Sequence, residues 1–402
     1  MTDTLRTLAD RFWDDFLEAH PTWATIIGDR RFDDQLDEVS PSAVAARIQW
    51  FDRVAADAGA IPVDSLTSME QVTRQMLIDE AMGGAASLRT RMDEWTVDPL
   101  GGPTVSLLDL ADYQTIATPE DGAALVERWR AIGRYLDQMG ANLREAAADG
   151  FVAVNKPVER VLDVLGNLEA TPADEWKLMA PAAEAHDDWS ETDLKRFREA
   201  VEGAVREIAI PAFRRYRETL ERAVLPVARP EDRPGLVHLP GGAETYRECI
   251  HVHTTLDLTP EEIHATGLAE IARIDAEFVE LGGRVLGTKD LASTLGVLRS
   301  DRKLYFETAD EVFATAKRSL VRATAAVTDW FGRVPGAACV VMPVPSHSEV
   351  HQTIAYYSWP ALDGSRPGRY YINLHAPETR PRYEAEALAF HEAVPGHHLQ
   401  IA

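Results

Sequence analysis

The segment that decides the fold of this chain reads, over residues 383–400, Tyr-Glu-Ala-Glu-Ala-Leu-Ala-Phe-His391-Glu392-Ala-Val-Pro395-Gly396-His397-His398-Leu-Gln. We expect a helix that begins after Pro381 and includes residues 383–394. A His-Glu pair on a helix, followed by further histidines, is typical of a helix that offers imidazoles to a metal ion and a carboxylate to a water molecule. The segment therefore predicts a metal site, with Glu392 as the candidate general base.

The spacing of the histidines requires the helix to break. In a straight helix the second ligand lies four residues after the first, and that position is Pro395. His397 would lie about 120° around such a helix, and His398 about 10.5 Å along its axis. Pro395 cannot donate a hydrogen bond to the carbonyl of His391, and Gly396 adds conformational freedom. We therefore predict His391 and His397 as ligands, with His398 as the alternative to His397.

The remaining histidines are weaker candidates. Six of the twelve histidines lie between His347 and His398, but clustering in sequence is not clustering in space. A structural role is favoured over metal binding for three of these and for two earlier ones: His347, His351, His375, His251 and His253.

The segment just before the His-Glu helix predicts a small sheet. Residues 338–344, 353–358 and 368–374 are rich in β-branched and aromatic side chains and are separated by turn-forming residues. We expect an antiparallel sheet over about residues 338–374, next to the helix. Arg366, between two of these strands, is a candidate for binding a substrate carboxylate. The alternative for Arg366 is a turn residue that pairs with Asp363.

The rest of the chain is expected to be mainly α-helical, because apolar residues recur at helical spacing. The clearest helix start is Thr259-Pro260-Glu261-Glu262, and that helix should run to Leu281 and stop at Gly282-Gly283. Proline- and glycine-rich breaks suggest an N-terminal and middle helical part (residues 1–225) and a C-terminal part (residues 226–402). We expect the two parts to form one continuous structural unit.

Composition narrows the classes of partner. The 402 residues include 41 basic and 65 acidic side chains, a net charge of -24, which disfavours binding to nucleic acid or to an anionic membrane. The N-terminus lacks the apolar stretch of a signal peptide, and no window is a membrane span, so the expected location is cytoplasmic. With only Cys249 and Cys339, we expect no disulfide. A monomer or small homo-oligomer is the expected state.

Four stretches carry a resemblance to a known family. They are residues 360–373, 383–400, 239–247 and 253–264. In these stretches the chain resembles the domain of unknown function 885 (DUF885) family, and the His-Glu-x-x-Pro-Gly-His string is the most specific part. The resemblance implies a relationship to zincin metallopeptidases, with a large helical fold, a deep cleft and a short sheet beside the active helix.

The same resemblance implies roles for individual residues. His391 and His397 would bind zinc, and Glu392 would be the general base in the hydrolysis of a peptide bond. The strand around residues 370–373 would be an edge strand that pairs with an extended peptide substrate. Tyr371 and Asn373 are therefore candidate substrate-binding residues.

The sequence departs from the family pattern at its end. Family members resemble one another well beyond the His-His-Leu-Gln string, where a later helix with a Glu-Gly-Trp-like motif supplies the third zinc ligand. Since the sequence ends at Ala402, we expect a C-terminally truncated zinc peptidase with an incomplete site. The alternatives are a catalytically inactive fragment, a noncatalytic helical peptide-binding module, or a third ligand recruited from Glu384, Glu386 or His375.

Overall fold

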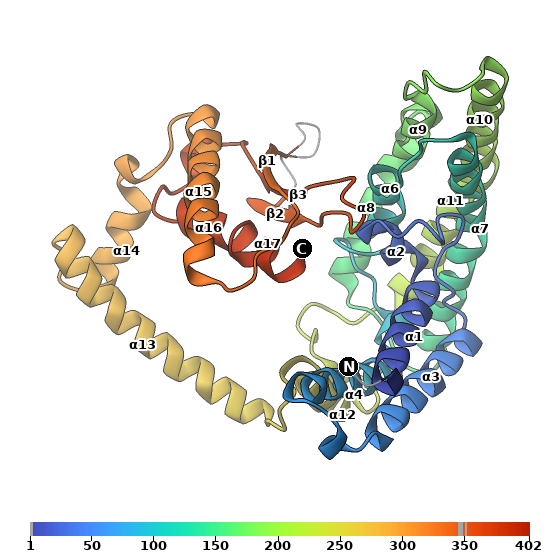
Figure 1. Cartoon of the computed structure of the whole chain (residues 1–402). Helices are drawn as coiled ribbons and strands as arrows, with labels where there is room; N and C mark the ends of the chain where they lie inside the picture. Colours follow the sequence, from blue (N-terminus) through green and yellow to red (C-terminus); the bar gives the residue numbers. More distant parts are fainter. Residues whose placement is uncertain (1–2, 345–348, 350–351) are drawn as a thin grey trace. The chain divides into compact units, whose positions relative to one another are not determined.

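The structure, a computed structural model, describes residues 3–344, 349 and 352–402. The chain is mainly α-helical with one small β-sheet, which confirms the predicted fold class (Figure 1). Its internal contacts divide it into two compact units. Unit 1 comprises Met1–Thr25 and Arg30–Pro260, and unit 2 comprises Ile26–Asp29 and Glu261–Ala402.

Unit 1 is built of helices, with two π-helical segments, Ala204–Ala209 and Leu220–Val224, on either side of α11. Its α-helices are α1 (Asp3–Ala19), α2 (Pro21–Ile27, which continues into unit 2), α3 (Pro41–Ala60), α4 (Ser68–Arg89), α5 (Met92–Trp95), α6 (Pro103–Tyr113), α7 (Pro119–Ala148), α8 (Asn155–Ala170), α9 (Ala180–Ala183), α10 (Glu191–Gly203), α11 (Ile210–Thr219) and α12 (Gly242–Thr254).

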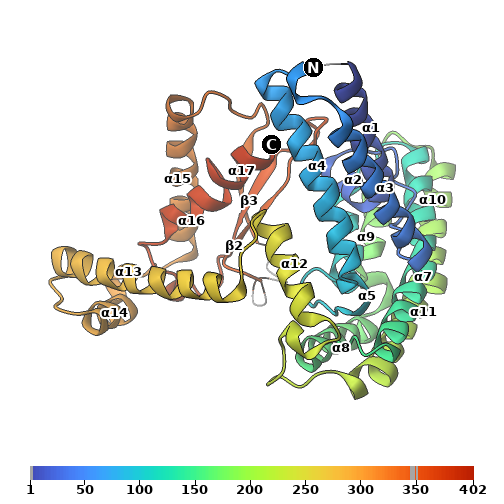
Figure 2. The ribbon, with the colours of Figure 1, turned by 90° about the horizontal axis from the view of Figure 1, so that it is seen from below.

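The core of unit 1 is organised around the long helix α7. Thr118 caps its first turn in a capping box with Asp121, and Pro119 occupies the first helical position. Apolar side chains then recur every three or four residues, among them the fully buried Trp129 and Ile132, and pack against α10 and α11. Helices α3 and α4 lie side by side in the same unit (Figure 2).

Residues 226–260 pack with the rest of unit 1. The physical reason is Arg229. Its backbone pairs with Ala153 and Asn155, and its guanidinium donates to the carbonyls of Val152 and Gly235. These bonds tie the segment after residue 225 to the start of α8.

Unit 2 contains a three-stranded sheet and the helices around it. The elements are α13 (Pro260–Leu286), α14 (Leu291–Ser300), α15 (Ala309–Trp330), β1 (Cys339–Pro343), β2 (Ala355–Ser358), β3 (Gly368–Ile372), α16 (Ala385–Glu392) and α17 (Gly396–Ile401). Helices α15 and α16 lie against the sheet (Figure 1). The core between them includes Phe306, Leu320, Tyr370, Ile372 and Val394.

The strand order is β1-β3-β2, and the sheet is mixed. β2 pairs with β3 in antiparallel fashion, as predicted, but β1 pairs with β3 in parallel. The prediction of a wholly antiparallel sheet was therefore wrong. The residue pattern gives the strands but not their order, and the last strand in sequence lies in the middle.

The predicted start of α13 at Pro260 is confirmed, but the predicted end at Leu281 was wrong. The helix continues through Gly282 and Gly283 to Leu286. Gly282 is buried because α14 packs closely there: an added Cβ at Gly282 would overlap Thr294 Oγ1 and lie 2.7 Å from Thr288 Oγ1. The glycine therefore permits helix packing and does not end the helix.

Gly282→Ala should destabilise unit 2 by about 1–3 kcal/mol, since the new methyl group would force apart the hydrogen-bonded Thr288 and Thr294 hydroxyls. Gly267→Ala is the matched control on the same helix, because a Cβ there meets no atom within 4 Å. It should stabilise by about 0.5–1 kcal/mol through helix propensity. Urea unfolding followed by circular dichroism measures both, and equal effects would contradict the packing argument.

Candidate metal centre

The His-Glu helix breaks before Pro395, as predicted, but α16 comprises Ala385–Glu392 and is shorter at both ends than the expected residues 383–394. Helix α16 ends at Glu392, and Ala393 leaves the helical region with φ -122 and ψ -112. The Val394–Pro395 peptide bond is cis, and α17 begins at Gly396. An added Cβ at Gly396 would overlap the carbonyl oxygens of Phe390 and His391. The start of α17 therefore lies directly against the last turn of α16.

This turn brings His391, Glu392 and His397 together. One potential ligand atom from each of the three lies within 4.8 Å of those of the other two. The imidazole rings of His391 and His397 have centroids 4.7 Å apart, and Nε2 of His397 lies 3.7 Å from Oε2 of Glu392. Two imidazoles and a carboxylate are donors that zinc prefers, so these side chains fit a metal ion.

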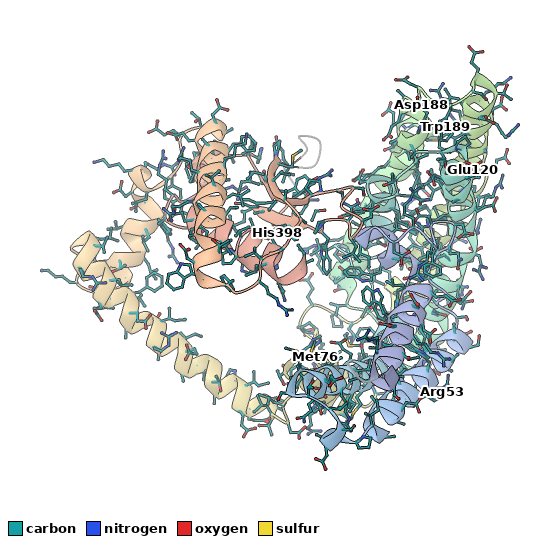
Figure 3. The ribbon with its side chains drawn as sticks, in the orientation of Figure 1. Arg53, Met76, Glu120, Asp188, Trp189 and His398 are labelled. Atoms are coloured by element: carbon teal, nitrogen blue, oxygen red, sulfur yellow. The ribbon has the colours of Figure 1, made fainter. Side chains whose placement is uncertain are left out.

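The side chain of His398, the alternative ligand, points away from His391 and Glu392 and toward Tyr357 and Ala337. It is buried at the junction of α17 with the sheet (Figure 3). Both ring nitrogens have partners: Nδ1 lies 2.7 Å from the hydroxyl of Tyr357, and Nε2 lies 3.0 Å from the carbonyl oxygen of Ala337. Burial lowers the pKa of His398, which favours a neutral ring. The structure therefore does not bring His398 into the cluster.

The carboxylate of Glu392 lies near the side chain of Tyr370. Burial, together with the negative charge of Glu392, raises the pKa of Tyr370, which is in the central strand β3. The side chain of Glu392 is only 13% exposed, whereas that of His397 is 35% exposed.

Cys339 in β1 is also partly buried, and burial raises the pKa of its thiol to about 11. The thiol is therefore protonated at neutral pH.

The residues considered as a recruited third ligand lie elsewhere. Glu386 forms an ion pair with Arg322, His375 lies 3.9 Å from Glu349, and Glu384 lines a cavity beside Phe306 and Tyr370. Within the described part of the chain, the cluster contains His391, Glu392 and His397 and no fourth histidine, cysteine or carboxylate.

The other histidines do not join the cluster. His251 and His253 are both exposed on α12. Nδ1 of His251 lies 3.0 Å from Oδ1 of Asp257, which follows the helix. His347 and His351 lie outside the described residues.

The guanidinium of Arg366 forms hydrogen bonds with main-chain carbonyl groups, and its roles in binding a substrate or in pairing with Asp363 stay predictions. It donates to the carbonyl oxygens of Trp359 and Ile26. Nearby, the main chain of Leu362 donates to the carbonyl oxygen of Ile27 at 2.7 Å. These bonds give Arg366 a role in attaching the Ile26–Asp29 segment within unit 2.

Tyr371 and Asn373 are placed by the central position of β3. The strand pairs with β1 on one side and β2 on the other, so it is not the edge strand that was expected. Asn373 is 1% exposed, and its amide donates to the carbonyls of Glu349 and Thr353. Tyr371 stacks on Tyr356 of β2 with ring centroids 4.7 Å apart. The amide of Asn373 therefore holds the loop that precedes β2.

Sequence reasoning missed Tyr357 and Gly368. The ring of Tyr357 lies 6.1 Å from that of His397, and its hydroxyl contacts His398. An added Cβ at Gly368 would overlap the Tyr357 hydroxyl and lie 2.7 Å from Nδ1 of His398. The glycine directly before an aromatic strand was a usable signal of close packing, but its partners are 11 and 30 residues away in the sequence.

No helix among the described residues combines the length and the apolar character needed to cross a membrane. None of the curated proteins matches the chain. Several solved structures do, among them the following two. The crystal structure of a protein from Colwellia psychrerythraea, provisionally called a lipoprotein, matches with a TM-score of 0.87 and 19% identity, over 100% of this chain and 72% of its own. A protein of unknown function from Shewanella oneidensis, also provisionally called a lipoprotein, matches with a TM-score of 0.68 and 15% identity, over 99% of this chain and 72% of its own.

At these identities the two structures show a shared fold and nothing about activity. The family is shown by the sequence itself, because residues 21–402 match the family described as bacterial protein of unknown function (DUF885). The match includes most of unit 1, the whole of unit 2 and the His391–His397 turn. The chain therefore belongs to the DUF885 family.

Proposed function

We propose that this chain is a zinc-dependent hydrolase of peptide bonds, in which His391 and His397 hold the metal and Glu392 is the general base. The observation that carries the proposal is the convergence of two imidazoles and a carboxylate within 4.8 Å, on a turn where α17 lies directly against the end of α16. The neighbouring His398 has two other partners for its ring nitrogens, whereas the ligand atoms of these three residues lie close to one another.

The residues divide the chemistry between them. A zinc ion, when bound, supplies a Lewis acid that lowers the pKa of a water molecule toward about 7. His391 and His397 would hold it through ring nitrogens, and the break between α16 and α17 brings the two imidazoles together. A carboxylate oxygen of Glu392 accepts the proton of the attacking water and delivers it to the leaving amine. The limited exposure of Glu392 keeps competing water away from this proton transfer.

The substrate chain is best placed on β2, and not on β3 as first expected. Within the described residues, β2 pairs with β3 alone and so forms an edge of the sheet. Asn373 donates its N–H to the carbonyl of Ile354, so in the alternating antiparallel pattern the main-chain groups of Tyr357 face away from β3. The ring of Tyr357 lies beside His397. A peptide added to this edge would therefore run past the proposed metal ligands.

The incomplete ligand set favours one second candidate. If Glu392 is the base, the described residues provide two metal ligands, and zinc catalysis ordinarily uses three. A peptide-binding module without catalytic activity would need none of them.

The cytoplasmic location, the absence of nucleic-acid partners and the oligomeric state stay predictions.

Metal analysis and peptide digestion test the proposal together. Purified protein should contain about one zinc ion per chain by mass spectrometry, as expected for a single site. A mixed peptide pool should show new cleavage products that disappear after treatment with a chelator and return when zinc is added. Folded protein that holds no zinc and cleaves no peptide would support the binding module. Chelator-resistant cleavage would overturn the assignment of the metal site.

A further inference from the structure

The side chains of Tyr357 and His398 form a buried hydrogen-bonded pair next to the proposed metal ligands. The carbonyl oxygen of Ala337 can only accept, so Nε2 of His398 carries the hydrogen in that 3.0 Å contact. In the neutral ring Nδ1 is then an acceptor, and the hydroxyl of Tyr357 donates to it at 2.7 Å. One tautomer of His398 thus satisfies both contacts, and neither ring nitrogen is free for a metal.

The pair connects four separate pieces of unit 2. Tyr357 is in β2, His398 is in α17, and Ala337 precedes β1. The fourth piece is β3, where Gly368 leaves the space that the two side chains fill, since an added Cβ would lie 2.7 Å from Nδ1 of His398. Gly368 also donates its N–H to the carbonyl of Ala338. The orientation of the His398 ring is therefore set by the sheet.

Helix α17 needs such an anchor. It contains six residues and begins after the turn at Ala393, so continuous helical hydrogen bonding with α16 does not set its direction. Fixing the ring of His398 fixes the backbone of the adjacent residue, His397. The ring of Tyr357 also lies 6.1 Å from that of His397, at an interplanar angle of 29°, and so limits where the His397 ring can lie.

We propose that Tyr357 and His398 are positioning residues that hold His397 at metal-binding distance from His391. The inference rests on the proposed zinc site and assigns the pair no contact with the metal. A buried histidine without partners would be costly, whereas one bonded to two different elements directs the segment that carries it. Partners that orient a metal ligand ordinarily change metal affinity 10- to 100-fold.

The test is the affinity for zinc alone, measured by competition with a chromophoric chelator. Tyr357→Phe keeps the ring beside His397 and removes only the hydroxyl, and should weaken zinc binding about 10- to 100-fold. Tyr305→Phe is the matched control, because it also removes a tyrosine hydroxyl in unit 2, which donates to the carbonyl of Leu298 at 2.9 Å and approaches that of Arg299 at 3.5 Å. The Tyr305→Phe variant should bind zinc with the affinity of the wild type. In the metal-free state its thermal unfolding midpoint should be similar to that of Tyr357→Phe.

A second pair of variants covers the case in which Tyr357→Phe does not fold. His398→Gln offers an amide donor for Ala337 and an oxygen acceptor for Tyr357, so it should bind zinc more tightly than His398→Leu. Equal zinc affinity of wild type and Tyr357→Phe, or of the two His398 variants, would overturn the positioning role while leaving the zinc site intact. Wild-type protein that binds no zinc would instead overturn the proposed function itself.

Discussion

Glu392→Gln is expected to abolish measurable peptide cleavage while leaving zinc bound. The amide has nearly the shape of the carboxylate but cannot accept the proton of the attacking water, and loss of a general base ordinarily lowers the rate about 10²- to 10⁴-fold. Because His391 and His397 remain, the variant should keep most of its zinc affinity. The measurements are the initial rate of cleavage of one peptide from the pool and the zinc content of the same sample.

The control for this prediction is Glu386→Gln, six residues earlier on α16. Glu386 pairs with Arg322 and lies outside the cluster, so the same chemical change there should leave the rate within a few fold. A Glu392→Gln variant that keeps the wild-type rate would remove the base from the mechanism. A variant that loses zinc along with activity would instead make Glu392 a ligand.

The sequence was most informative where local rules decide the structure. The Thr259-Pro260 start of α13, the strand segments and the break at Pro395 follow from the properties of single residues and their neighbours. The end of α13 does not follow from local rules, because Gly282 has the properties of a helix stop and yet lies inside the helix. A glycine is needed at position 282 because Thr294 of α14 packs against it. The sequence around Gly282 gives no sign of this contact.

The same limit applies to the site. Pro395 and Gly396 predict a break that brings His397 toward His391. Which of His397 and His398 joins the cluster depends on Tyr357 and Ala337, which bond to His398 from distant parts of the chain. The assignment of β3 as the edge strand failed for a related reason. Strand order follows from how β1 and β2 pack on both sides of β3, and three aromatic-rich segments can be ordered in several ways.

His397→Ala should reduce zinc affinity more than any other single change outside His391. It removes a donor atom, whereas the loss of a partner that only orients a ligand costs about 10- to 100-fold, so we expect a loss greater than about 100-fold. The fold should survive, because the side chain is 35% exposed. His264→Ala, on the exposed surface of α13, is the control and should bind zinc normally.

Cobalt(II) substitution separates this effect from that of Tyr357→Phe. Removing His397 changes the set of donor atoms, so the visible absorption spectrum at saturating cobalt should change in shape and intensity. Tyr357→Phe keeps both imidazoles, so its spectrum should approach the wild-type form once enough cobalt is added. If His397→Ala instead retained the wild-type affinity and spectrum, the second imidazole would have to come from a different residue. The turn between α16 and α17 would then have a structural role alone.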